Sequence, residues 1–474
     1  MILAKKRSRR EMDMLSGPLF GKIMAFSFSL MLTNVLQLLY NAADLMIIGQ
    51  FSGNDTSVAA VGATTVLVNM IVNFFIGLSV GVSVLVARGY GTGDRKETEK
   101  AVHTAMSLAI IFGFVVLAIG LLFSKTFLEW MNTSPVILDQ STLYLGIYFL
   151  GAPFNMVYNF GAAILRATGD AKRPLYFLSI SGLVNVVLNF VFVYFFRMDV
   201  AGVALATVIS QVISAILIVM SLRRQEGMCR LHIRKLCVHK NSFLEIIRIG
   251  LPASIQNMLF AISAILIQSS VNSFDIPFAA LGKTPYTSGS SAANTIEGFL
   301  YTSLNSFYHA SMNFTGQNYA AKKYKRVRRV MYACMAATVS VGLILGSLII
   351  IFGKPLLSIY IPGDTEAIAY GYQRLLVMCP LYFLCGVMEV LVGQLRGLGR
   401  SLVPMFISVV GICGFRIFWI YTVFALRHSW SVLFLSYPVS WVLTSAILYI
   451  CCHIIQKKMP KEDMPAAASA EAAV

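Results

Sequence analysis

Long apolar segments with almost no charged residue recur along the whole sequence. Examples lie at residues 175–196, 200–222 and 330–353, and the short segments between spans hold Gly, Pro, Asn and Asp, which are typical of turns. Each apolar segment has roughly the 20 residues that an α-helix needs to cross a bilayer. Because these segments are continuous and not alternating, they predict membrane-spanning helices rather than the strands of a β-barrel.

Twelve spans are predicted in this way, six in each half of the chain. The fold class is therefore expected to be an all-α integral membrane protein with 12 transmembrane helices in two six-helix lobes. The spans lie near residues 19–49, 58–87, 101–124, 136–165, 175–196, 200–222, 243–274, 291–319, 330–353, 366–395, 403–426 and 430–455.

The composition excludes a soluble globular protein. Hydrophobic residues make up 57% of the 474 residues and charged residues 12%, about half the charged fraction that is typical of soluble domains. A net charge of +17 would suggest a nucleic-acid partner in a soluble protein. Here the basic residues cluster between spans and no nucleic-acid-binding motif accompanies them, so no nucleic-acid partner is expected.

The basic residues are divided unevenly between the two sides of the predicted membrane. Most of the 38 Lys and Arg residues lie in the N-terminus, in the loops after even-numbered spans or in the C-terminal tail. The loops after odd-numbered spans hold only Lys125, Arg197, Lys283, Lys354 and Arg427. By the positive-inside rule, both termini are expected in the cytoplasm.

The two halves of the chain repeat each other. The motif LRATG at residues 165–169 recurs 230 residues later as LRGLG at 395–399, and a proline follows each copy. Repeated six-helix halves in parallel orientation are typical of secondary transporters, with the substrate path between the halves. The expected organisation is a cytoplasmic N-terminus (1–18), an N-lobe (19–222), a cytoplasmic linker (223–242), a C-lobe (243–456) and a cytoplasmic tail (457–474) that is expected to be disordered.

Several motifs together resemble the MATE (multidrug and toxic compound extrusion) family of transporters, of the bacterial type. They are LTNVLQLLYNAADLMIIG at residues 32–49, VAAVG at 58–62, GLSVG at 77–81 and GLP at 250–252. The resemblance covers residues 19–455. It implies alternating access and export of cationic amphiphilic drugs and toxins, in exchange for inward H⁺ or Na⁺, across a bacterial inner membrane.

Five of the charged residues inside predicted spans are candidates for a functional role. They are the acidic Asp44, Glu297 and Glu389 and the basic Arg374 and Arg416. An ionised side chain at mid-bilayer costs about 3 kcal/mol or more on insertion scales, so each is expected to have a partner or a function. A carboxyl group in this setting is also a natural proton carrier, because the apolar surroundings disfavour its charged form.

Asp44 is the strongest candidate for ion coupling. Asn185 and Asn189 are spaced i,i+4 in the fifth span and so share one helix face, and Thr207 adds a hydroxyl from the sixth span. Amide oxygens can ligate a small cation, and amide N–H groups can hold a carboxylate. The MATE resemblance implies that these four positions form the N-lobe cation site. Many relatives carry a second acid where this chain has Asn189, which favours H⁺ over Na⁺; the alternative is that Asp44 only reaches water at the outer end of its span.

The acidic residues of the C-lobe have two interpretations. Glu297 and Glu389 could counter a cationic substrate or form a second coupling site, or they could form structural ion pairs, for example Glu389 with Arg416. Gln256 and Asn257 could extend a polar pocket or hydrogen-bond between helices.

No catalytic or metal-ligating pattern accompanies these residues. The six histidines form no cluster, the eight cysteines include no CxxC pair, and no ATPase domain is present, so an enzyme, a metal and a cofactor are not expected and ion gradients supply the energy. The expected partners are the lipid bilayer and small organic cations, and a monomer suffices. The alternative function is a flippase for lipid-linked precursors within the same superfamily, which would favour several intramembrane arginines where this chain shows two.

Overall fold

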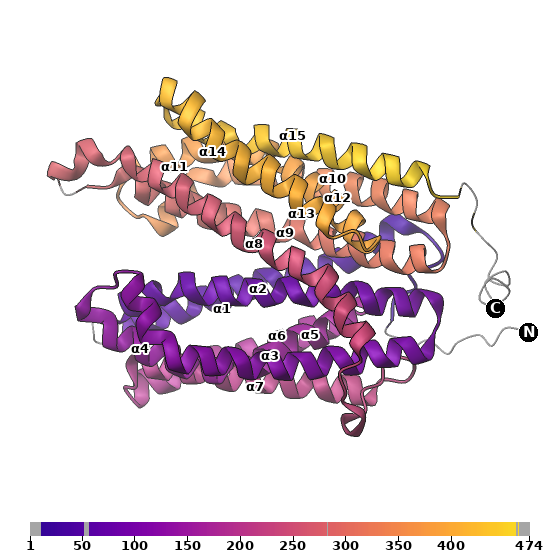
Figure 1. Ribbon diagram of the computed structural model, residues 1–474. Coiled ribbons are helices and arrows are strands. Elements are labelled where there is room, and N and C mark those ends of the chain that lie inside the picture. Colours follow the sequence, from indigo (N-terminus) through magenta and orange to yellow (C-terminus); the bar gives the residue numbers. More distant parts are fainter. Residues whose placement is uncertain (1–10, 52–55, 282, 461–462, 464–474) are drawn as a thin grey trace, which may run out of the picture. The chain divides into compact units, whose positions relative to one another are not determined.

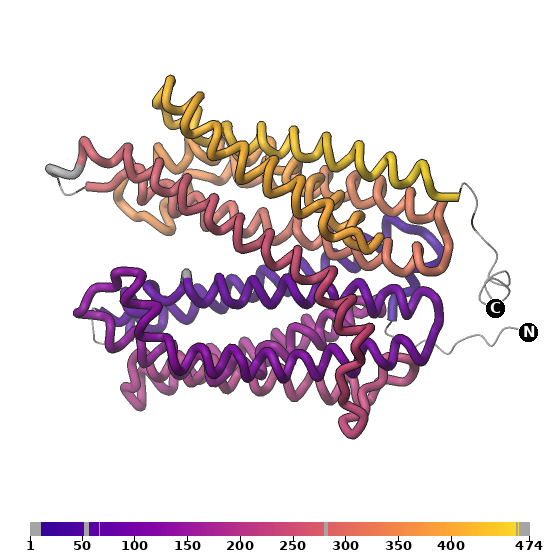
Figure 2. The backbone as a smooth tube through the Cα atoms, viewed as in Figure 1, coloured from indigo at the N-terminus to yellow at the C-terminus, as the bar shows by residue number. Residues whose placement is uncertain are grey.

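A computed structural model describes residues 11–51, 56–281, 283–460 and 463, and these residues form helices and connecting loops with no strand among them (Figures 1 and 2). Lys5, Lys6, Arg7, Arg9 and Arg10 contribute to the predicted orientation but lie outside the described residues, so that orientation stays a prediction. Most of the tail that is predicted to be disordered also lies outside them.

Ten segments within the described part of the chain are long and apolar enough to cross a membrane. They are α1 (Leu19–Phe51), α2 (Ser57–Thr92), α3 (Arg95–Trp130), α6 with η1 (Lys172–Phe195), α7 (Asp199–Arg224), α8 (Lys240–Ser273), α10 (Tyr324–Tyr360), α11 with η4 and α12 (Thr365–Gly397), α13 through η6 (Leu402–Phe424), and α15 (Trp430–Lys457).

The other two predicted spans are also helical but differ in character. The span predicted at 136–165 forms α4 (Pro135–Leu150) and α5 (Ala152–Ala167), which are separated at Gly151 just before Pro153. The span predicted at 291–319 lies within α9 (Pro285–Ala320), which is rich in Ser, Thr and Asn. All twelve predicted spans are therefore helical, and the all-α membrane fold class is confirmed.

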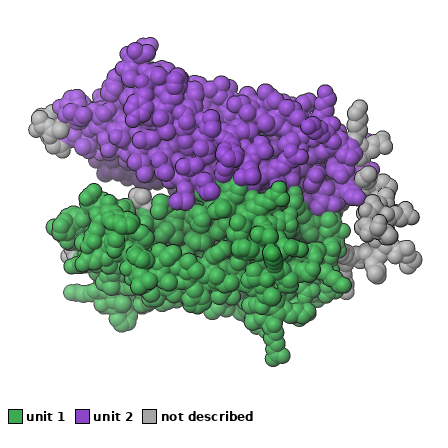
Figure 3. All heavy atoms as spheres, in the orientation of Figure 1, with its two compact units in different colours: residues 1–13, 32–254 green, residues 14–31, 255–474 purple. Residues whose placement is uncertain are grey.

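The chain divides into two compact units (Figure 3). Unit 1 comprises residues 1–13 and 32–254, and unit 2 comprises residues 14–31 and 255–474. The predicted lobes differ from these units because the first part of α1 belongs to unit 2 and the first part of α8 belongs to unit 1. The predicted domain boundaries follow the repeat in the sequence, whereas the two units follow the packing of the helices. The predicted boundaries therefore stay a prediction.

In unit 1, α5 packs against α2, α3 and α7, and α6 packs against α7 (Figure 1). At the end of this bundle where α1 and α6 finish, Ile48 of α1 joins a buried cluster with Tyr144 of α4 and Val203 of α7. This apolar cluster orients the last turns of α1 towards α4 and α7, and Asp44 lies one turn before Ile48.

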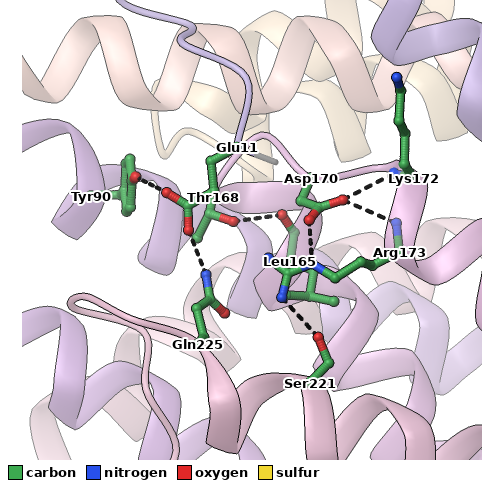
Figure 4. A network of polar contacts seen from close by, with 9 residues as sticks. All are labelled: Glu11, Tyr90, Leu165, Thr168, Asp170, Lys172, Arg173, Ser221 and Gln225. Carbon is green, nitrogen blue, oxygen red and sulfur yellow. Dashed lines mark hydrogen bonds and ion pairs between the residues drawn. The ribbon is translucent and has the colours of Figure 1, made fainter. Parts of the chain in front are cut away.

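The first copy of the repeated motif, residues 165–169, runs from the end of α5 into the turn before α6, and Asp170 holds this turn (Figure 4). Its carboxylate accepts hydrogen bonds from the backbone N–H groups of Lys172 (3.1 Å) and Arg173 (3.0 Å) and pairs with the Arg173 guanidinium. Arg173 also donates to Ser221 Oγ on α7 at 2.8 Å. One buried carboxylate therefore connects the start of α6 to α7.

The predicted linker docks onto the first turns of α3. His103 Nδ1 lies 2.6 Å from the carbonyl oxygen of Glu99, which can only accept, so Nδ1 carries the proton. His103 Nε2 then accepts the backbone N–H of His232 in the linker at 3.1 Å. Lys235 and Glu99 form a more exposed ion pair beside it at 3.1 Å.

In unit 2, the polar helix α9 packs against α10, α11 and α12. Its buried polar groups find partners on those neighbours: Ser311 Oγ donates to the Val390 carbonyl at 2.8 Å, and Thr315 Oγ1 donates to Gln394 Oε1 at 2.5 Å. Gly393 permits this contact, because a Cβ there would overlap the backbone of α9 at Tyr308. A helix enclosed by other helices can be polar and still lie within the membrane.

Candidate functional site

The candidate site of unit 1 begins with a close approach of α1 and α6. A Cβ on Gly182 of α6 would overlap the ring of Tyr40 of α1, so the absence of a side chain lets the two helices meet. The Tyr40 hydroxyl donates to the Ser179 carbonyl at 3.3 Å. Asp44 lies one turn after Tyr40, and Asn185 and Asn189 lie one and two turns after Gly182, so this contact aligns the three polar residues.

The four residues selected from the sequence form one chain of hydrogen bonds. Asn189 Nδ2 donates to the Asp44 carboxylate and also lies 3.3 Å from Asn185 Oδ1. Asn185 Nδ2 donates to Thr207 Oγ1 at 3.4 Å, and Thr207 donates to the Val203 carbonyl at 3.0 Å. Side chains from α1, α6 and α7 are therefore brought together, and Asp44 contacts an amide of α6 rather than only reaching outwards.

This chain of hydrogen bonds leaves one buried oxygen unused. The Asn189 side chain is 0% exposed, and its Oδ1 atom has no hydrogen-bond partner among the described residues. Asp44 is half-buried. The arrangement can therefore accept a proton on the carboxyl group or a small cation between the carboxylate and an amide oxygen.

Two tyrosines that sequence reasoning missed complete the surroundings of Asp44. Tyr144 and Tyr148 of α4 stack with ring centroids 6.1 Å apart, and both interact electrostatically with Asp44. Their i,i+4 spacing is a signal that places them on one helix face. What the spacing could not show is that this face is turned towards α1.

In unit 2, Glu297 of α9 is neutralised by Arg374 of α11 (Thr365–Met378). Arg374 Nε donates to Glu297 Oε1 at 2.9 Å and a terminal nitrogen donates to Oε2 at 2.8 Å, which is a bidentate ion pair. Arg374 also donates to Ser290 Oγ (2.6 Å) and Asn294 Oδ1 (3.0 Å). The buried ion pair of this unit thus joins Glu297 to Arg374, and not Glu389 to Arg416 as considered from the sequence.

The location of Arg396 in the structure corrects the one that the sequence predicts. The predicted span 366–395 ends one residue before Arg396 and would leave this arginine in a cytoplasmic loop, but Arg396 lies in the last turn of α12 (Tyr382–Gly397) with a buried side chain. Its terminal nitrogens donate to the Tyr308 hydroxyl at 2.7 Å and to Gln256 Oε1 at 2.9 Å. Gln256 therefore belongs to a polar cluster, and Asn257 follows it on α8 with a half-buried side chain.

Glu389 and Arg416 lie in the same unit without forming an ion pair with each other. Glu389 of α12 interacts electrostatically with Arg396 and with Tyr301. Arg416 of α14 (Phe415–Trp419) donates from Nε to Ser440 Oγ at 3.4 Å and lies over the ring of Tyr437. Within the described residues, no group of His, Cys, Asp and Glu side chains could hold a metal ion.

Comparisons with known proteins agree with this architecture. The probable multidrug resistance protein YoeA of Bacillus subtilis is 26% identical over 444 residues, which cover 91% of this chain and 93% of that protein. The probable multidrug resistance protein NorM of Thermotoga maritima is 23% identical over 410 residues, which cover 85% and 83%.

Solved structures show the same fold. A structure described as the outward-facing conformation of a multidrug resistance MATE family transporter of the MOP superfamily has a TM-score of 0.85 at 20% identity, covering 96% of this chain and 100% of that one. A crystal structure of MATE in complex with MaL6 has a TM-score of 0.86 at 18% identity, covering 94% and 98%. A family model described as MatE matches residues 29–191 and 243–422, which is more than half of the sequence. The chain therefore belongs to the MatE family, a family of multi-pass membrane transporters.

Proposed function

We propose that this protein is a secondary active multidrug exporter. It exchanges cationic amphiphilic drugs and toxins for inward H⁺ or Na⁺ by alternating access. The names of YoeA and NorM support the multidrug part of this proposal, since both relatives align over most of this chain. The lipid bilayer and small organic cations are its partners, and neither an enzymatic activity nor a cofactor is part of the proposal.

The observation that carries the proposal is the hydrogen bond from Asn189 to Asp44. It joins a carboxyl group on α1 to an amide on α6, inside two membrane-spanning helices. Binding a proton or a cation at Asp44 neutralises its charge and so changes the strength of this contact, because a charged acceptor makes a stronger hydrogen bond than a neutral one. Ion binding thereby changes the free energy of holding α1 against α6.

H⁺ is the proposed coupling ion, with Na⁺ as the alternative. Asp44 is the only carboxylate in the chain of hydrogen bonds, and one titratable group is enough to carry one proton. Na⁺ would need several oxygen ligands, and the unused Asn189 Oδ1 is one oxygen that could serve. The two ions can be separated by imposing their gradients one at a time.

The cellular setting follows from the same proposal. The basic residues are concentrated at the N-terminus and in the loops after even-numbered spans. A transporter with this distribution would lie in a bacterial inner membrane with both termini in the cytoplasm. One chain supplies both halves of the repeat, so a monomer would suffice.

The test is dye efflux from everted vesicles with H⁺ and Na⁺ gradients imposed separately. Substituting Asp44→Asn is expected to lower gradient-driven efflux by about tenfold or more, since the group that carries the ion is removed. Asp139→Asn is the matched control because Asp139 is an exposed acid of α4 in the same unit. Undiminished efflux by the Asp44 variant at equal expression would end the proposal.

A flippase for lipid-linked precursors is the alternative and is not favoured. Three arginines, Arg374, Arg396 and Arg416, are buried in unit 2, which is one more than the sequence indicated. Arg374, however, is neutralised by Glu297 and is not available to a pyrophosphate group.

A further inference from the structure

The linker between α7 and α8 begins and ends on one side of the membrane. α7 ends at Arg224, α8 begins at Lys240, and both helices are long and apolar enough to span a bilayer. In Figure 1 this segment projects sideways from the ends of the helices of unit 1 instead of continuing along their axes. Lipid head groups are expected to surround a helical bundle at this level.

Hydrogen bonds hold the linker in one conformation on unit 1. The backbone N–H of Leu231 donates to the Leu222 carbonyl at 3.0 Å, and that of His239 donates to Thr104 Oγ1 of α3 at 3.1 Å. The contact with His103 described above adds a third attachment. A surface that is built on this segment is therefore formed before any partner binds.

Part of the linker is apolar and packs inwards. Met228, Cys229 and Leu231 are buried, and the last two belong to one hydrophobic cluster with Val102 of α3. These side chains are covered by unit 1, so they leave the remaining linker side chains to face the surroundings.

The remaining linker side chains include exposed aliphatic groups. Ile233, which begins the 3₁₀ turn η2 (Ile233–Lys235), is 49% exposed, and Val238 is 39% exposed. Aliphatic surface is unfavourable in water, but it is favourable at the boundary between lipid head groups and acyl chains.

The same segment has an excess of basic side chains. Residues 223–240 hold one acid, Glu226, and six exposed basic residues, which are Arg223, Arg224, Arg230, Arg234, Lys235 and Lys240. Among these six, only Lys235 forms an ion pair with a described residue, namely Glu99. Five positive charges on this face of unit 1 are therefore not neutralised by the described part of the chain.

This combination matches an anionic lipid surface. A cluster of about four to eight Lys or Arg residues next to a membrane-spanning helix is attracted to anionic head groups, and the attraction acts within about a Debye length. The aliphatic side chains and the apolar stems of the arginines can enter the boundary below the head groups. A small anion in solution would satisfy the charges but not the aliphatic groups.

We propose that the head groups of anionic phospholipids bind to a linker surface formed by Arg230, Ile233, Arg234, Val238 and Lys240. The arginines pair with phosphate oxygens, which suit the planar fork of a guanidinium, and the two aliphatic side chains insert beside them. Lipid binding at this surface is independent of the substrate and of the coupling ion proposed above.

The test places a fluorophore on Cys237, which is exposed beside Val238, in full-length protein whose half-buried Cys451 is replaced by alanine. The protein is reconstituted into liposomes of phosphatidylcholine alone or with about half phosphatidylglycerol, each containing a small fraction of lipid with a nitroxide on its head group. Quenching by the nitroxide is expected to be about twofold or more stronger with phosphatidylglycerol. About 0.5 M salt should remove most of this increase, because it shortens the Debye length.

Three variants make the result specific. The double variant Arg230→Gln and Arg234→Gln is expected to lose more than about half of the increase. Arg95→Gln with Lys96→Gln is the matched control, because it removes two exposed basic residues from the start of α3 in the same unit, and it should keep the increase. Ile233→Ser is expected to lower quenching in both lipid compositions, since it removes an inserting side chain.

The opposite results would overturn the proposal. Equal quenching in the two lipid compositions would show that the linker surface does not select anionic head groups, and weak quenching in both would leave it to a partner from solution. An equal loss in the control variant would assign the effect to net charge. Cys229 that becomes reactive towards a maleimide in anionic liposomes would show that the linker undocks, and that the docked surface is not the site. None of these measurements involves transport, so multidrug export stands or falls separately.

Discussion

Asn189 donates its side-chain amide to the carboxylate of Asp44, and this bond joins α6 to α1 within unit 1. Both residues lie in membrane-spanning helices, where a polar contact has little competition from water. The bond depends on how closely the two helices approach, and that approach is set one to two turns away, where Gly182 faces the ring of Tyr40.

Gly182→Ala is expected to separate α1 from α6. The added methyl group would overlap the Tyr40 ring, and overpacking of this kind costs about 1–3 kcal/mol of stability. Loss of the bond between Asn189 and Asp44 should lower gradient-driven dye efflux as well. Gly146→Ala is the matched control, because a Cβ at Gly146 of α4 would meet nothing within 4 Å. Equal efflux by the two variants would show that the close approach has no role in transport.

Glu297 and Glu389 are expected to respond differently to removal of their charge. Glu297→Gln leaves Arg374 without its anion, and breaking a buried ion pair from one side costs about 3–5 kcal/mol. Glu389→Gln removes a buried charge that has no hydrogen bond in the described structure, so stability should stay the same or rise. Thermal unfolding of both variants in detergent measures the difference. A lower Tm for the Glu389 variant than for the Glu297 variant would contradict the pairing described above.

Asp170→Ala is expected to destabilise unit 1 by about 3 kcal/mol, because Asp170 is buried and holds the start of α6. Glu97→Ala is the control: Glu97 forms an ion pair with Lys100 at the same i,i+3 spacing, but both side chains are exposed. An exposed pair of this kind is worth less than about 1 kcal/mol. Thermal unfolding of the two variants should separate them clearly, and similar losses would show that burial does not determine the effect.

His103→Ala is expected to release the linker from α3. The substitution removes both the proton donor to Glu99 and the acceptor for the His232 backbone N–H. Cys229 at the start of the linker is 1% exposed, so its labelling by a maleimide, followed by peptide mass spectrometry, should accelerate several-fold if the linker undocks. His453→Ala serves as the control, since His453 is exposed on α15. An unchanged labelling rate would show that other contacts suffice to hold the linker.

The membrane-spanning helices could be predicted because their cause is local. A segment that enters a bilayer must satisfy its own backbone and present apolar side chains to lipid, and both requirements can be read from a window of about 20 residues. Even the polar helix α9 was predicted within a few residues of its end, because its charged residues are few.

The side-chain partners could not be predicted in the same way. Arg396 resembles a loop residue because it is next to a turn, and only the packing of α12 against α9 buries it beside Tyr308. The choice of Arg374 as the partner of Glu297, with Arg416 left unpaired, depends likewise on which helix faces meet.

The sequence by itself determined the all-helical membrane fold class, the approximate position of each helix, the resemblance to a transporter family, and most of the charged residues that lie inside helices. The tertiary structure decided which of those charges neutralise one another and which remain available. The reason is physical: entry into the membrane depends on the composition of one segment, whereas a hydrogen bond or an ion pair depends on the rotation and separation of two segments that are far apart in the chain.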